Sequence, residues 1–244
     1  MLHRLIFEKL IEMKTYKHIF FDLDHTLWDF ESNSGATLQV LFHQFQLAEK
    51  GVGSFELFRS TYEKHNEKFW ERYRKGYVRR AELRWKRMWH TLLEFKVADV
   101  AFAKELSVQY LEMLPSQGKL MPFALEVLDY CVEKNYEIHL ITNGFEETQW
   151  QKMRTSGIDH YFKQVITSEK SNSMKPKPAI FDYALNAAGA TVSESIMIGD
   201  SIEADVLGAK LYGMDHVFYN PLSKVHEHQF TYEITCLSKL KELL

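Results

Sequence analysis

The chain has 244 residues, of which 45% are hydrophobic and 26% charged, and its formal net charge is −3 at pH 7. This length suits one large domain or a core domain with an insert, and the composition is that of a globular protein. The small negative charge argues against a general affinity for nucleic acids or membrane surfaces. No run of about 18 uncharged apolar residues is present, so no membrane span is expected.

Residues 1–12 lack the apolar core of a signal peptide and are expected to form an N-terminal extension ahead of the first strand. The two cysteines, Cys131 and Cys236, are far apart and have no metal-type spacing. Both suit small buried residues of a reducing compartment. We therefore expect a cytoplasmic protein with no obligate protein partner.

Six short runs rich in Ile, Val and Phe predict the strands of the core. Most of them do not alternate apolar with polar residues, which is typical of a parallel sheet covered on both faces. Helical periods lie between the runs, so the expected fold is α/β, with a doubly wound, Rossmann-like parallel sheet. The expected strands are 18–22, 137–142, 164–167, 195–199, 216–219 and 232–235, and the helices between them are 122–135, 146–156, 178–188 and 201–212.

The stretch 33–116 differs from the rest because its apolar residues recur at helical spacing and it has no convincing strand. Breaks near residues 51–53, 76 and 99 divide it into helices. We therefore expect an all-helical cap domain inserted after the first strand, with an α/β core built from 13–32 and 117–244. The expected cap helices are 33–49, 54–74, 79–95 and 98–114.

Asp22 and Asp24 stand where the first expected strand ends. In open α/β sheets, ligands bind beyond the carboxyl ends of the strands, and alternation along the chain would point both carboxylates to one side. Two carboxylates that close repel each other unless a cation lies between them or one is protonated. The pair therefore predicts a divalent metal, a proton-sharing acid–base pair, or both; the alternative is a helix N-cap with a solvated neighbour.

Two later strand ends also carry polar groups. Thr142 and Asn143 precede Gly144 at the end of the second strand, where a hydroxyl and exposed N–H groups can form a small anion cradle. The alternative is an ordinary turn. Lys175 lies in a Lys-Pro-Lys-Pro segment before a helix, and a lysine on so rigid a turn can point at a fixed charge. Its alternative is a solvated loop lysine.

The fourth expected strand ends in Gly199 and continues into Asp200, Ser201 and Asp205. On its own this is equally a helix N-cap. Together with the other clusters, however, it places acids, a hydroxyl and a lysine at the carboxyl ends of one sheet. Hard oxygen ligands beside cationic and N–H donors suit Mg²⁺ and a phosphoryl group.

At these clusters the chain resembles the haloacid dehalogenase-like (HAD) hydrolase superfamily. "DLDHT", "LITNG", "KPKP" and "GDSIEAD" are similar to its four motifs and stand in the same order. The helical insert resembles the cap of the family's first cap class. "DHTLWDFESN" and "GYVRRAELR" resemble the 5′-nucleotidase subgroup that acts on pyrimidine and non-standard nucleoside monophosphates. The resemblance covers roughly residues 16 to 238.

The resemblance implies that Asp22 is a nucleophile that forms an aspartyl-phosphate, and that Asp24 protonates the leaving oxygen and then activates water. Dehalogenases of the family lack the second aspartate, so Asp24 favours phosphate-ester chemistry. The other implied roles are Thr142, Asn143 and Lys175 for the phosphoryl oxygens, Asp22, Asp24 and Asp200 for Mg²⁺, and Asp205 and Ser201 as their supporting neighbours.

The resulting hypothesis is a Mg²⁺-dependent phosphatase for small phosphate monoesters, most specifically a 5′-nucleotidase for pyrimidine nucleoside monophosphates. One alternative is a sugar-phosphate phosphatase or a phosphomutase similar to β-phosphoglucomutase, which uses the same four motifs. Another is a non-catalytic interaction protein that retains the fold. The presence of every motif residue argues against this last alternative.

The segment 72–87 holds eight arginines or lysines and one acid. We expect a solvated helix face, with a nucleic-acid face and the steering of an anionic substrate as alternatives. Trp28, Trp70 and Tyr77 are candidates for stacking on a base, although aromatic residues in a cap are more often core. Arg84, or a basic neighbour, is a candidate for a second anion contact.

Overall fold

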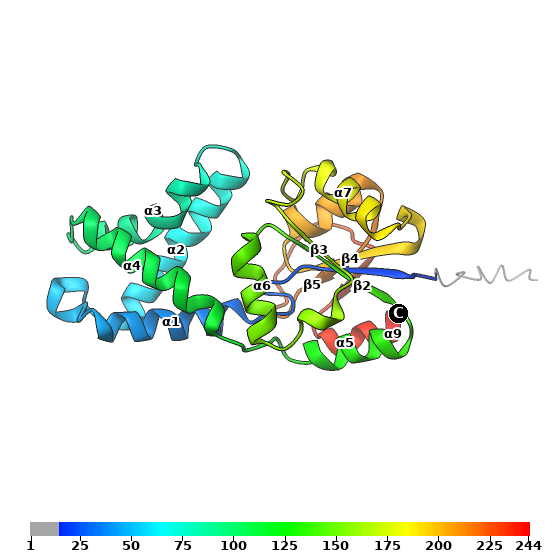
Figure 1. Ribbon diagram of the computed structural model, residues 1–244, viewed down its shortest axis with the longest axis horizontal. Helices are drawn as coiled ribbons and strands as arrows, with labels where there is room; N and C mark the ends of the chain where they lie inside the picture. Colours follow the sequence, from blue (N-terminus) through cyan, green and yellow to red (C-terminus); the bar gives the residue numbers. More distant parts are fainter. Residues whose placement is uncertain (1–14) are drawn as a thin grey trace, which may run out of the picture.

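The computed structural model describes residues 15–244, so the expected extension 1–12 lies outside the described residues. Its centre is a six-stranded sheet in the order β3-β2-β1-β4-β5-β6, with every neighbouring pair parallel. Helices cover both faces of the sheet (Figure 1). The expected α/β parallel fold is therefore confirmed. The strands are β1 His18–Phe21, β2 Glu137–Thr142, β3 Gln164–Thr167, β4 Ser195–Gly199, β5 Asp215–Tyr219 and β6 Tyr232–Ile234.

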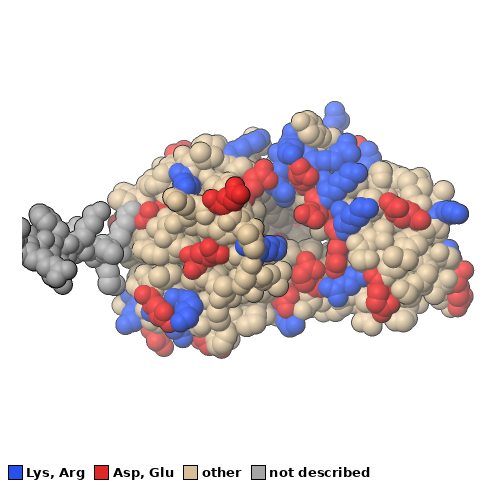
Figure 2. Space-filling view, turned by 180° about the vertical axis from the view of Figure 1, so that it is seen from behind, with Lys and Arg blue, Asp and Glu red and all other residues tan. Residues whose placement is uncertain are grey.

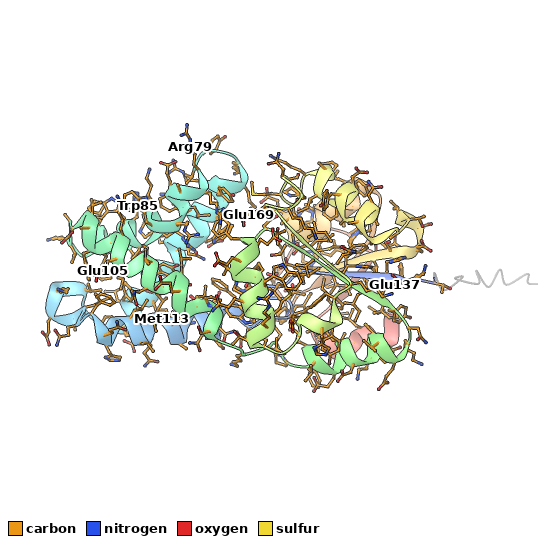
Figure 3. The ribbon with its side chains drawn as sticks, in the orientation of Figure 1. Arg79, Trp85, Glu105, Met113, Glu137 and Glu169 are labelled. Atoms are coloured by element: carbon orange, nitrogen blue, oxygen red, sulfur yellow. The ribbon has the colours of Figure 1, made fainter. Side chains whose placement is uncertain are left out.

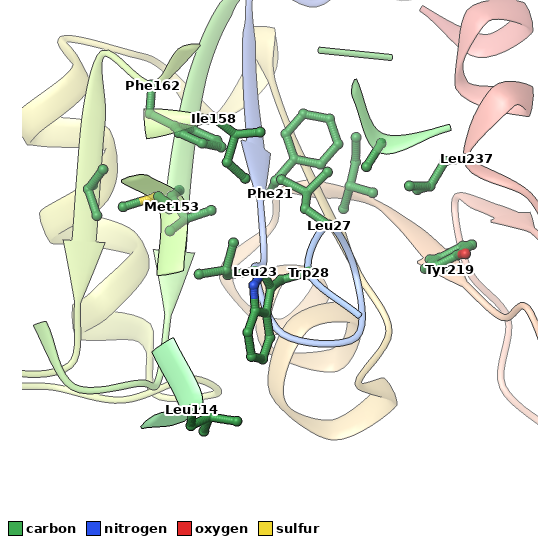
Figure 4. Close-up of a cluster of buried hydrophobic side chains, with 14 of the residues drawn as sticks. Phe21, Leu23, Leu27, Trp28, Leu114, Met153, Ile158, Phe162, Tyr219 and Leu237 are labelled. Carbon is green, nitrogen blue, oxygen red and sulfur yellow. The ribbon is translucent and has the colours of Figure 1, made fainter. Parts of the chain in front are cut away.

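Strand β1 shows why the core runs are apolar without alternating. Ile19 and Phe21 belong to the hydrophobic cluster on one face of the sheet, and Phe20 belongs to the cluster on the other face. Figure 4 shows the first of these clusters around Phe21 and Met153. Both faces of β1 are buried, so every position favours an apolar side chain. The helices of the core are α5 Ala124–Glu133, α6 Glu146–Thr155, α7 Pro178–Ala188, α8 Gly208–Tyr212 and α9 Leu240–Leu243.

Four helices between β1 and α5 form a lobe beside the sheet (Figure 1). The first begins three residues before its expected start, because the Asp29 carboxylate caps it by accepting a hydrogen bond from the N–H of Ser32 at 3.0 Å. No strand lies between β1 and α5 along the chain, so this lobe is all-helical. They are α1 Phe30–Gln44, α2 Phe55–Arg74, α3 Arg80–Glu94 and α4 Val100–Met113.

The two chain segments that join this lobe to the sheet are bonded to each other. The carbonyl of Lys119 accepts hydrogen bonds from the Asn33 amide at 2.8 Å and from the N–H of Asp29 at 3.0 Å. The Trp28 indole N–H donates to the carbonyl of Gln117 at 3.3 Å. These bonds hold the helical lobe over the carboxyl ends of the strands.

Two features of the C-terminal part differ from the sequence-based expectation. The helix expected over 201–212 is a wider, π-helical turn at Ile202–Leu207 followed by the short α8. In that wider turn the N–H of Val206 reaches the carbonyl of Ser201 at 3.2 Å. The terminal helix α9 was not expected. No helix within residues 15–244 is long and apolar enough to cross a membrane.

Candidate active site

A cavity of about 750 Å³ lies between the strand ends and the helical lobe. Figure 2 shows it as a hollow between the two lobes, bordered by acidic and basic side chains. The structure brings most of the sequence-predicted core residues to this one place, although they come from four separate strand ends. The predicted residues that line the cavity are Asp22, Asp24, Thr142, Asn143, Lys175, Asp200, Ser201 and Asp205.

Lys175 is the buried cation of the site and is only 2% exposed. Its Nζ lies 2.5 Å from Asp22 Oδ1 and 2.6 Å from Asp205 Oδ1, and it donates to the carbonyl of Ile141 at 2.6 Å. The Asn143 side chain holds the main chain of Lys175 at both ends, accepting from its N–H at 2.8 Å and donating to its carbonyl at 2.9 Å. The ammonium group is therefore fixed beside Asp22.

Asp200 lies on the other side of this ion pair. The Thr26 hydroxyl donates to Asp200 Oδ1 at 3.2 Å and accepts from the N–H of Asp200 at 3.1 Å. A Cβ atom at Gly199 would lie 2.3 Å from Asp205 Oδ2, so glycine is required for this close approach. Carboxylate oxygens of Asp22, Asp200 and Asp205 lie within 4.8 Å of one another.

The charges of these carboxylates are only partly balanced. Burial raises the pKa of Asp22 well above its usual value, and the nearby charges of Asp205 and Asp200 add to this, while Lys175 opposes it. Burial and the charge of Asp205 raise the pKa of Asp200 to about 7. One lysine cannot balance two buried acids, Asp22 and Asp205, and the half-buried Asp200, so a further cation would lower the repulsion among them. Carboxylate oxygens are hard donors, which fits Mg²⁺.

Asp24 has its own partners, which the sequence analysis missed. Lys152, 3% exposed, places Nζ 2.6 Å from Asp24 Oδ1. Gln149 donates to Asp24 Oδ2 at 2.9 Å and to the Thr142 hydroxyl at 2.8 Å. Burial by itself would raise the pKa of Asp24, but the charge and hydrogen bond of Lys152 outweigh it and lower that pKa below its usual value. Asp24 is thus held as a carboxylate beside Asp22.

A sequence signal for these partners did exist. Gln149 and Lys152 are three residues apart on α6, so they share one face of the helix. This face is buried, and Met153 is its apolar member. This pattern begins a few residues after Thr142. Polar residues at helical spacing on a face that packs on the core indicate that they contact the site.

Three of the candidate substrate contacts, Trp28, Tyr77 and Arg84, do not line the cavity, which corrects the expectation that Trp28 and Tyr77 stack on a base and that Arg84 contacts an anion. Trp28 is fully buried under Lys152, whose Nζ is 4.3 Å from the ring centroid. Tyr77 is 72% exposed, and Arg84 is exposed on α3. Trp70 does line the cavity.

The basic segment 72–87 therefore divides between two surfaces. Trp85, near its C-terminal end, lies beside α4, where Lys104 Nζ is 5.1 Å from the centroid of its ring (Figure 3). Arg74 and Arg87 line the cavity instead. Arg87 follows Arg84 by almost one helical turn and is 4% exposed. Arg87 is thus a basic neighbour of Arg84 that lines the cavity, and a second anion contact from it stays a prediction.

Comparisons with known proteins agree with this geometry. Residues 16–213 match the haloacid dehalogenase-like hydrolase family. The chain is 31% identical to the pyrimidine 5′-nucleotidase PynA of Streptococcus pneumoniae, covering 94% of this chain and 95% of that protein. It is 29% identical to the pyrimidine 5′-nucleotidase YjjG of Escherichia coli, covering 93% and 96%. The solved structure of the putative HAD-hydrolase YfnB from Bacillus subtilis, bound to magnesium, matches with a TM-score of 0.84 at 26% identity, covering 94% of this chain and 99% of that one.

Proposed function

Because the chain belongs to the haloacid dehalogenase-like hydrolases, we propose that it is a Mg²⁺-dependent phosphatase that hydrolyses nucleoside 5′-monophosphates, pyrimidine ones first. One observation carries the proposal: a buried lysine is fixed 2.5 Å from Asp22, with Asp24 lining the same cavity. The names of the two pyrimidine 5′-nucleotidases that are similar over nearly the whole chain support the choice of substrate.

In the first half-reaction an Asp22 oxygen attacks phosphorus while the bond to the ester oxygen breaks, leaving an aspartyl-phosphate. Lys175 and the Thr142 hydroxyl hold the phosphoryl oxygens and balance their charge. When bound by Asp22, Asp200 and the main-chain carbonyl of Asp24, Mg²⁺ supplies further positive charge at this position. Mutual repulsion of the buried carboxylates favours a bound cation.

Asp24 moves the proton in both halves. The leaving ester oxygen takes a proton from Asp24, and in the second half Asp24 takes one from the water that attacks phosphorus, releasing phosphate and freeing Asp22. Lys152 and Gln149 hold Asp24 in the ionised form that this second half needs. For the first half, the entering phosphoryl dianion raises the proton affinity of the carboxylate, because like charges repel.

The first prediction tests this function directly. Phosphate release is measured for dUMP, dTMP, UMP, AMP, glucose 6-phosphate and β-glucose 1-phosphate, with Mg²⁺ and in excess EDTA. We expect the pyrimidine nucleotides to have the highest kcat/KM and EDTA to abolish turnover. The control is Asp22→Ala, which keeps the Lys175–Asp205 pair and should be folded and inactive.

A clear preference for a sugar phosphate would contradict the nucleotidase proposal. Isomerisation of β-glucose 1-phosphate without release of phosphate would indicate a phosphomutase. Full activity in EDTA would contradict the metal requirement, and substantial activity in a folded Asp22→Ala protein would contradict the nucleophile.

A further inference from the structure

The lobe-side wall of the cavity carries polar side chains that take no part in the phosphoryl chemistry. Tyr62 and Asn66 come from α2 and are four residues apart, so they lie on one face of that helix. Trp70 follows another four residues along the same face. Arg87 comes from the neighbouring α3. All four line the cavity that also contains Asp22.

Tyr62 is the clearest sign that this wall is incomplete. Its side chain is 1% exposed, and its hydroxyl makes no hydrogen bond of good geometry among the described residues, although the Tyr110 hydroxyl is close to it. Its ring lies beside that of Tyr110, with centroids 5.1 Å apart, but the Tyr110 hydroxyl is bonded to Ser34 at 2.8 Å. A buried hydroxyl without a well-formed hydrogen bond is destabilising, because the loss of its bonds to water is not compensated. A ligand atom in the cavity would remove that cost.

Arg87 also has hydrogen-bond donors that the described residues do not use. Its Nε donates to the carbonyl of Leu83 at 2.9 Å and its Nη1 donates to Asn66 Oδ1 at 2.6 Å. No carboxylate within residues 15–244 forms an ion pair with it. The bond to Asn66 also fixes the orientation of that amide, whose NH₂ group is left as a donor. The wall therefore offers spare N–H groups from Arg87 and Asn66, together with a hydroxyl that can donate or accept.

The surroundings argue against a second phosphate as the ligand of this wall. Glu31, Glu63 and Glu67 line the same cavity. Lys64, Arg74 and Arg87 line it as well, so the acidic and basic residues of the lobe side are equal in number. This balance provides no net positive field for a second phosphate, whereas a neutral ring with carbonyl oxygens needs none. The Trp70 ring, on the same face of α2, provides an aromatic surface for a planar group.

We infer that Tyr62, Asn66 and Arg87 form a subsite for the base of the leaving group, and that it selects a pyrimidine with two ring carbonyls. This inference rests on the proposed nucleotidase function and adds the residues that read the base. Uracil and thymine offer two carbonyl acceptors and one N–H donor, which matches two N–H donors and a hydroxyl that accepts. Adenine has no carbonyl and leaves the donors of Arg87 and Asn66 poorly matched.

The test compares a substrate that has a base with one that has none. The variants Tyr62→Phe and Arg87→Met are assayed with dUMP, dAMP and p-nitrophenyl phosphate. Arg84→Met is the matched control, because Arg84 is an exposed arginine on the same helix outside the cavity. Tyr62→Phe keeps the buried ring and removes only the hydroxyl, so it tests the subsite even if Arg87→Met fails to fold.

We expect Tyr62→Phe and Arg87→Met to lower kcat/KM for dUMP by roughly 10-fold or more, the scale of losing a buried hydrogen-bonding partner of a substrate. Turnover of p-nitrophenyl phosphate should stay within about 2-fold of wild type, and the preference for dUMP over dAMP should fall. Arg84→Met should resemble wild type with all three substrates.

The outcomes separate the two proposals. A wild-type enzyme that hydrolyses p-nitrophenyl phosphate and no nucleotide refutes the nucleotidase function, and the subsite with it. A wild-type enzyme that prefers dUMP, and keeps that preference in Tyr62→Phe, overturns the subsite alone. Equal losses for dUMP and p-nitrophenyl phosphate would also overturn it, because they would indicate a general defect of the cleft.

Discussion

The two walls of the cavity treat buried polar groups in opposite ways. On the strand-end wall, Lys175 pairs with two carboxylates and Asp24 is bonded to both Lys152 and Gln149. On the lobe wall, the Tyr62 hydroxyl makes no hydrogen bond of good geometry among the described residues. Under the proposed function, the phosphoryl end of the cleft is thus assembled before substrate arrives, whereas a bound substrate would complete the leaving-group end.

This difference has a physical meaning for catalysis. Groups that stabilise a transition state act best when their positions are already fixed, because no reorganisation is then needed during the reaction. Groups that choose between substrates act through the cost of staying unpaired when the wrong substrate binds. Changes to the strand-end wall should therefore affect every substrate, and changes to the lobe wall only those with a base.

After the loss of activity expected for Asp22→Ala, the largest effect is expected from Asp24→Ala, on the strand-end wall. Without the acid and base, kcat/KM for a nucleotide should fall by roughly 10²–10⁴. The loss should be smaller for p-nitrophenyl phosphate, whose leaving group needs little protonation. Steady-state kinetics of both substrates check this. Equal losses for the two esters would show that Asp24 is not the acid, even if every substrate is affected.

The strand-end wall was also the easier one to anticipate from sequence. Parallel strands bring their carboxyl ends to one edge, so apolar runs that end in Asp22, Thr142 and Gly199 predict a shared site before any side chain is placed. The boundaries of β2, β3 and β4 are those expected. The order of strands and helices along the chain determines the topology, and the topology places these residues at one edge of the sheet.

The lobe wall was harder because its geometry depends on the rotation of each helix. On α3, Arg84 and Arg87 differ by almost one turn, yet one is exposed and the other lines the cavity. Residues three apart lie close together on a helix surface, so periodicity cannot tell which of these two arginines is turned toward the cavity and which toward solvent. Lys152 was missed for a related reason: a lysine on a helix is normally solvated, and only the packing of α6 buries this one.

A moderate effect is expected from Lys152→Met, which removes the cation beside Asp24 and keeps a long apolar chain over Trp28. Lys152 lowers the pKa of Asp24, so its loss should raise that pKa. The base form needed in the second half-reaction would then be lost at a higher pH, moving the acid limb of the kcat profile upward. At neutral pH, kcat should fall roughly 10- to 100-fold, the scale of one hydrogen bond to a charged group.

The pH profile is the measurement that separates this role from a structural one. Gln151→Met, one residue away on the same helix and exposed, is the matched control and should leave the profile unchanged. If Lys152→Met lowers kcat by one factor at every pH, Lys152 acts on packing and not on the ionisation of Asp24. A loss of activity confined to nucleotides would instead indicate that Lys152 acts on the leaving group.

The smallest effect is expected from a change in the segments that join the helical lobe to the sheet. Asp29 caps α1 through the N–H of Ser32 and lies 3.0 Å from Nζ of Lys119, which belongs to the other connecting segment. Asp29→Ala should lower the free energy of unfolding by about 1 kcal/mol, mainly through the lost cap. The exposed Lys119 adds little, because water screens that ion pair. Urea denaturation measures the loss.

The pH dependence of that loss identifies its origin. Burial by itself would raise the pKa of Asp29, but the hydrogen bonds from Ser32 and Lys119 outweigh it and lower that pKa below its usual value. The stability it contributes is therefore present above the unfolded-state pKa and disappears as the pH falls through the lower folded-state pKa. Ser54→Ala removes a neutral cap, which accepts from the N–H of Leu57 at 3.2 Å, and provides the control. The cost of Asp29→Ala should shrink in acid while that of Ser54→Ala stays constant; two parallel pH curves would contradict a charged cap at the junction.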